Sequence, residues 1–98
     1  MATAVGGCTP AFFALFARHL IEAATQRGMD AATARSIVGG TLLGTGKLLD
    51  ANDTNTAAVI AAVASPGGLT ERALHSFDES GLRDAVSRAV ATVLGEQS

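Results

Sequence analysis

Apolar residues recur every three or four positions in the last part of the chain. They fall on one face of a helix and are Leu82, Ala85, Val86, Ala89, Val90, Val93 and Leu94. Arg83, Asp84 and Arg88 fill the opposite face. This is the cleanest amphipathic period in the sequence, and it predicts a helix that begins near Leu82 and ends before a frayed tail at residues 95–98.

The same periodicity, together with helix start and stop signals, predicts four more helices upstream. Their expected ranges are residues 11–26, 31–49, 56–63 and 70–77, with a polar turn at residues 50–55. Asp30 is expected to cap the second helix, and Gly28 to end the first. Thr9 followed by Pro10 fits an N-cap with proline at the first helical position, so residues 1–7 are expected to form a leader. Since no stretch alternates apolar with polar residues, the chain is predicted to be all-α.

Length and composition favour one domain, residues 1–98, that associates with a second copy. The 98 residues include seven Lys and Arg in no cluster, and the net charge of −2 disfavours nucleic acid and anionic membranes as partners. The longest apolar run, residues 10–17, is shorter than the ~20 residues that span a bilayer. Because 48% of the residues are hydrophobic, one compact monomer would leave apolar surface exposed.

The reactive side chains of the sequence form no recognisable catalytic or metal set. Cys8 is the single cysteine, which rules out an internal disulfide and suits a reducing cytoplasm. One cysteine and two histidines supply too few metal ligands. No spacing brings His19 or His75 to Cys8, and the adjacent Asp78 and Glu79 are interpreted as solvated charges.

Glycines inside the second predicted helix allow two interpretations. They are Gly39, Gly40, Gly44 and Gly46. A phosphate-binding loop would need a preceding strand and Ser or Thr after its lysine, whereas Lys47 is followed by Leu48. Each helical Gly costs up to ~1 kcal/mol relative to Ala, so we interpret them as sites of close helix packing, within the chain or across a dimer. No dinucleotide-binding fingerprint is present either.

One stretch requires a special backbone, and it reads Ser-Pro-Gly-Gly-Leu-Thr from Ser65 to Thr70. Pro66 fixes its own φ, Gly67 and Gly68 permit positive φ, and Thr70 is expected to cap the next helix. Free N–H groups at that helix N-terminus, flanked by the hydroxyls of Ser65 and Thr70, suit a small anion such as a carboxylate. The alternative is a plain turn between helices, with Thr70 only capping.

Several stretches resemble, in family order, the pyrroline-5-carboxylate reductases. Residues 65–70 are similar to the family's Ser-Pro-Gly-Gly-Thr-Thr signature, residues 7–12 to Gly-Ser-Gly-Pro-Ala-Tyr, and residues 79–83 to Glu-x-Gly-Gly-Leu-Arg. The resemblance implies a C-terminal helical bundle that forms an interleaved homodimer, as in 6-phosphogluconate-dehydrogenase-like reductases. The family's N-terminal Rossmann domain, which binds NADP or NAD, has no counterpart in this sequence, so the chain alone is expected to bind neither.

The same resemblance implies roles for four residues of the turn. Ser65 and Thr70 would donate hydrogen bonds to 1-pyrroline-5-carboxylate, with Thr70 as the catalytic residue. Gly67 and Gly68 would shape the backbone around the substrate carboxylate. Joined to its nucleotide-binding domain, the chain would belong to an enzyme that reduces this substrate to L-proline; the isolated chain is expected to be inactive.

Departures from the family pattern leave the substrate open. They are Cys8, Thr9, Phe12 and Leu69, which stand where the family has Ser, Gly, Tyr and Thr. Two alternatives therefore remain. One is a freestanding helical interaction module that has lost the chemistry, and the other is a paralogous domain that acts on another imine or small acid.

Overall fold

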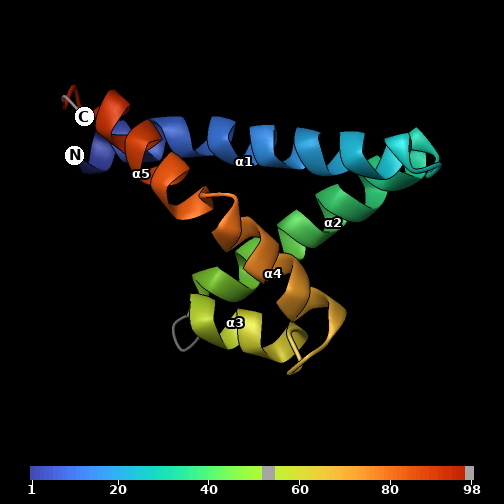
Figure 1. The fold of residues 1–98 in the computed structure, drawn as a ribbon. Helices are drawn as coiled ribbons and strands as arrows, with labels where there is room; N and C mark the ends of the chain where they lie inside the picture. The colour runs from blue at the N-terminus through green and yellow to red at the C-terminus, as the bar shows by residue number, and fades with distance from the viewer. Residues whose placement is uncertain (52–54, 97–98) are drawn as a thin grey trace. The chain divides into compact units, whose positions relative to one another are not determined.

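The computed structural model describes residues 1–51 and 55–96, and within these ranges the chain is all-α, as predicted (Figure 1). Its helices are α1 (Ala2–Gln26), α2 (Ala31–Asp50), α3 (Thr56–Val63), α4 (Leu69–Glu79) and α5 (Leu82–Val93). The chain divides into two compact units. One unit comprises Thr9–Thr56, and the other comprises Met1–Cys8 together with the described residues of Ala57–Ser98.

Helix α1 begins at Ala2, so the expectation of a non-helical leader with Thr9 as the N-cap was wrong. The Val5 N–H donates to the Met1 carbonyl at 3.0 Å, and Pro10 lies inside the helix. A proline has the same φ at the first position of a helix and in its interior, so the sequence Thr9-Pro10 fits both positions. The interior position loses one backbone hydrogen bond of α1.

The extension gives α1 25 residues, which makes the helix long enough to cross a membrane. Over 18 residues its mean hydropathy is 1.3, so among the described residues it is the one helix long and apolar enough to span a membrane. None of that window is buried within the chain. A helix that another protein copy covers meets the same criterion, so composition alone does not distinguish a bilayer from a protein partner.

The connection between α1 and α2 forms as the sequence predicts. Gly28 has a φ of 101°, and the N–H groups of Gly28 and Met29 donate to the carbonyls of Thr25 and Ala24, both at 3.1 Å. This pair of bonds is a Schellman motif, which ends a helix at a left-handed glycine. Asp30 then caps α2, since its side chain accepts from the Thr33 N–H at 3.1 Å. Helix α2 ends at Asp50, and residues 52–54 of the expected polar turn lie outside the described residues.

Helix α5 also ends in a Schellman motif, so the first residues of the expected frayed tail are ordered by backbone hydrogen bonds. The N–H groups of Gly95 and Glu96 donate to the carbonyls of Thr92 and Ala91 at 3.1 and 2.9 Å. Residues 97–98 of that tail lie outside the described residues. Gly81, with a φ of 85°, separates α5 from α4, which continues two residues beyond its expected end to Glu79.

Very little of the chain is buried within itself. Ala34 is the one buried residue in the described ranges, with 1% of its surface exposed. A Cβ added at any of the four glycines of α2 would meet nothing within 4 Å beyond that helix. Within their own unit, Thr9–Thr56, no other segment packs closely against these glycines, and close packing across a dimer stays a prediction.

Replacing Asp30 with alanine tests the cap of α2. Asp30→Ala is expected to lower the free energy of unfolding by about 1 kcal/mol, because it removes the acceptor for the Thr33 N–H. Asp30→Asn is the matched control and should lower it by only a few tenths of a kcal/mol, since asparagine caps about as well as aspartate. Chemical denaturation at equal protomer concentration measures both. Equal losses in the two variants would contradict the assigned cap.

Candidate functional site

The connection between α3 and α4 contains a type II β-turn at residues 65–68. The Gly68 N–H donates to the Ser65 carbonyl at 3.0 Å, and Gly67 has a φ of 71°. Proline at the second position and a left-handed glycine at the third are the features that define this turn type. The expectation that this stretch needs a special backbone is confirmed at Gly67.

Gly68 has an ordinary φ of −79°, but the space for a side chain at this position is limited by Ser65. A Cβ at this position would lie 2.6 Å from Ser65 Oγ and 3.2 Å from the Ser65 carbonyl oxygen. A larger residue would therefore displace the Ser65 side chain. In the structure the Ser65 hydroxyl lies close to Gly68, the N-cap of α4.

Thr70 does not cap α4, contrary to the sequence-based expectation. Helix α4 begins at Leu69, with Gly68 in the extended N-cap conformation and no side-chain capping bond. Thr70 is consequently the second residue of the helix, and it is half-buried. The glycine after the turn already has the extended backbone that an N-cap needs, so the helix starts before Thr70.

Glu71 contacts the turn from the first turn of α4, a role that the sequence-based prediction did not include. Its Oε1 atom accepts a hydrogen bond from the Gly67 N–H at 3.0 Å. With Gly68 as the N-cap, Glu71 is the third residue of α4, where a capping-box glutamate stands. The three-residue spacing from Gly68 to Glu71 is a sequence signal for this contact, but it applies only when Gly68 and not Thr70 is the N-cap.

The start of α4 leaves hydrogen-bond donors for a ligand. The first backbone N–H groups of a helix have no acceptor within the helix. Gly67 and Gly68 donate within the turn, whereas the Leu69 and Thr70 N–H groups have no acceptor among the described residues. Two adjacent N–H groups at the positive end of a helix can bind a carboxylate, and the Ser65 hydroxyl lies close to Gly68, which precedes them.

Elsewhere in the described residues, the histidines and the cysteine form no competing site. His19 Nδ1 lies 3.8 Å from Glu22 Oε2 in an exposed pair along α1. His75 Nε2 lies 2.5 Å from Glu79 Oε1 in an exposed pair along α4. Such pairs contribute little to stability. Within residues 1–51 and 55–96, no three or more His, Cys, Asp or Glu side chains are grouped closely enough to hold a metal ion. Cys8 is half-buried and forms no disulfide.

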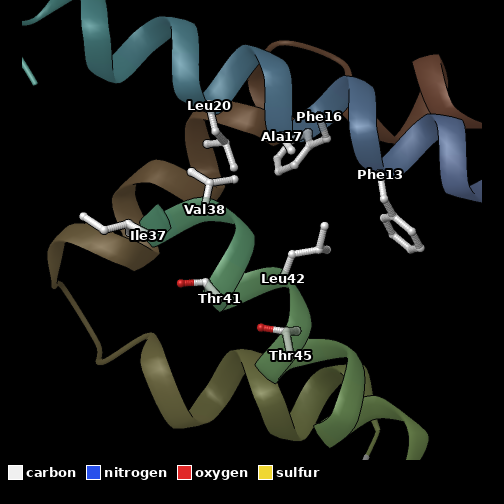
Figure 2. A pocket seen from close by; sticks show the side chains of 9 residues that line it. All are labelled: Phe13, Phe16, Ala17, Leu20, Ile37, Val38, Thr41, Leu42 and Thr45. Atoms are coloured by element: carbon white, nitrogen blue, oxygen red, sulfur yellow. The ribbon is translucent and has the colours of Figure 1, made fainter. Parts of the chain in front are cut away.

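The unit Thr9–Thr56 contains an apolar groove of about 360 Å³ between α1 and α2 (Figure 2). Its lining comes from both helices and consists of Phe13, Phe16, Ala17, Leu20, Ile37, Val38, Thr41, Leu42 and Thr45. Two threonine hydroxyls are the lone polar side-chain groups in this lining, too few to orient a small polar substrate. The groove suits apolar side chains of another protein segment.

The sequence matches a family model described as pyrroline-5-carboxylate reductase dimerisation over residues 1–97. Among similar proteins, pyrroline-5-carboxylate reductase 3 of Xenopus laevis is 43% identical over 88 residues, which are 90% of this chain and 32% of that protein. The pyrroline-5-carboxylate reductase of Corynebacterium melassecola is 33% identical over 87 residues, or 89% and 32% of the two chains. This chain therefore spans about a third of the length of these relatives.

The fold agrees with a solved member of the same group. The crystal structure of Plasmodium falciparum pyrroline carboxylate reductase with NADP bound superposes with a TM-score of 0.86 and 29% sequence identity. The match covers 94% of this chain and 35% of the other. With a family match over nearly every residue and the same helical fold, the chain belongs to the pyrroline-5-carboxylate reductase dimerisation family.

Proposed function

We propose that this chain is the dimerisation and substrate-binding domain of an NAD(P)H-dependent reductase that converts 1-pyrroline-5-carboxylate to L-proline in the cytoplasm. The observation that carries the proposal is the turn at residues 65–68, which presents Ser65 and the first N–H groups of α4 together. The family match supports the reaction, because the relatives are named for it.

The nicotinamide cofactor does not fit the residues described. Dinucleotides bind where a strand, a glycine-rich turn and a helix meet, and the described ranges contain no strand. The proposal therefore assigns NADP or NAD to a nucleotide-binding domain outside these 98 residues. What these residues contribute is the binding and orientation of the substrate.

The substrate carboxylate is proposed to lie at the N-terminus of α4. There the Leu69 and Thr70 N–H groups and the Ser65 hydroxyl would donate to its oxygens. The Thr70 hydroxyl, from the second position of the helix, would donate to the ring nitrogen. Gly67 and Gly68 shape this site by permitting the left-handed turn and the close approach of Ser65. Fixing both ends of a small ring in this way orients its C=N bond for reduction.

Removal of the Thr70 hydroxyl tests the proposed site. In the full-length gene product, assayed with NADPH and with NADH, Thr70→Ala is expected to lower kcat/KM for pyrroline-5-carboxylate about 10- to 100-fold, through the lost hydrogen bond. Thr92→Ala is the matched control and should change kcat/KM less than about twofold, because Thr92 Oγ1 donates to the Arg88 carbonyl of α5.

The outcomes separate the proposal from its alternatives. Turnover by the wild-type protein that Thr70→Ala leaves unchanged would contradict the role of Thr70. No turnover of pyrroline-5-carboxylate by a folded dimer would contradict the reaction. Turnover of other cyclic imines would then favour a paralogous reductase, and none at all would favour an interaction module.

The second copy of the proposed homodimer is expected to cover the groove between α1 and α2. Ile37 lines this groove and is 53% exposed, so an aspartate there disturbs the monomer little. Ile37→Asp should raise the dimer dissociation constant at least about tenfold, because a buried isoleucine contributes about 1.5–3 kcal/mol. Light scattering or sedimentation over a range of protein concentrations measures this constant.

Ser36→Asp provides the control for the added charge. Ser36 is exposed and, at 100° per residue, faces away from the α2 residues that line the groove. The dissociation constant of this variant should stay within about threefold of wild type. A wild-type chain that is monomeric at micromolar concentration, or equal effects of the two aspartates, would contradict the proposed interface.

A further inference from the structure

Glu71 holds one particular peptide group of the turn, the group that joins Pro66 to Gly67. Its carboxylate accepts the N–H of that peptide at 3.0 Å. In a four-residue turn this central peptide can face either way, and its two orientations distinguish type I from type II. The left-handed φ of 71° at Gly67 shows which orientation is present.

A flipped peptide would bring the Pro66 carbonyl oxygen toward the Glu71 carboxylate in place of the N–H. Two oxygen acceptors would then face each other, one of them charged, and the Gly67 N–H would lose its partner. Glu71 therefore selects the type II form. In that form the backbone of Gly68 lies against the Ser65 side chain, as the 2.6 Å approach of a hypothetical Cβ to Ser65 Oγ shows.

We propose that Glu71 is a positioning residue for the substrate site. Its carboxylate fixes the peptide between Pro66 and Gly67, and thereby keeps the Ser65 hydroxyl beside the first N–H groups of α4. The catalytic consequence rests on the proposed reductase function. The negative charge of Glu71 would repel a carboxylate substrate and weaken its binding. The favourable contribution to be tested is therefore the hydrogen bond that Glu71 accepts from the Gly67 N–H.

Steady-state kinetics of the full-length enzyme tests the substrate side of the proposal. Glu71→Ala is expected to raise KM for pyrroline-5-carboxylate roughly three- to tenfold and to leave kcat within about twofold, because the site is less well ordered before substrate binds. Glu71→Gln keeps an acceptor without the charge, so its KM should stay within about threefold of wild type. An unchanged KM in Glu71→Ala, or equal increases in both variants, would overturn the proposal.

Glu79→Ala is the matched control on the same helix. Glu79 is exposed and pairs with His75, and its removal changes the net charge of α4 by the same amount. KM should stay within about twofold of wild type, since the turn is untouched. An increase as large as that of Glu71→Ala would assign the effect to charge and overturn the positioning role.

Amide hydrogen exchange of Gly67 tests the contact without any activity. In the same proteins labelled with ¹⁵N-glycine, Gly67 exchange should be roughly three- to tenfold faster in Glu71→Ala than in wild type, and unchanged in Glu79→Ala. If the wild-type protein shows no turnover but Gly67 exchanges faster in Glu71→Ala, the reductase function is refuted and the contact between Glu71 and the turn is supported. If the wild-type protein turns over normally but Gly67 exchange is unchanged in Glu71→Ala, only the role of the Glu71 contact is refuted.

Discussion

Apolar surface that the chain cannot cover by itself is the constraint on which the rest of this structure depends. Ala34 is the one buried residue in the described ranges, whereas Ile37 and Val63 remain 53% and 66% exposed. Hydrophobic burial is the main favourable term in folding. Helices as short as α3, α4 and α5, which have 8, 11 and 12 residues, are marginal without it. The chain belongs to a dimerisation family, and the glycines of α2 leave open space beside that helix.

The turn at residues 65–68 has a different origin. Its geometry follows from contacts within seven consecutive residues, namely the Gly68 bond to Ser65, the Gly67 bond to Glu71 and the left-handed φ of Gly67. Local hydrogen bonds of this kind form without a large apolar core. The backbone geometry of the turn is consequently encoded in a short segment.

Much of the fold could be predicted from the sequence, because the signals used were local. Gly28 and Asp30 each have one low-energy role at a helix boundary, and the structure contains both. Thr9 and Pro10 failed as a start signal, because proline has the same φ inside a helix as at its beginning. The burial pattern could not be derived either, since an amphipathic face predicts that something covers it and not which chain does so.

The candidate site shows the same limit at the scale of one residue. Gly68 and Thr70 are both acceptable N-caps, with about equal propensity for that position. The preceding type II turn decides between them, because Gly68 leaves the turn in an extended conformation. Helix α4 therefore begins at Leu69. Moving the cap by two residues turns Thr70 from a capping residue into a side chain available to a ligand, and turns Glu71 into the acceptor for Gly67. The sequence thus identifies the segment, but the roles of its residues follow from where the helix begins.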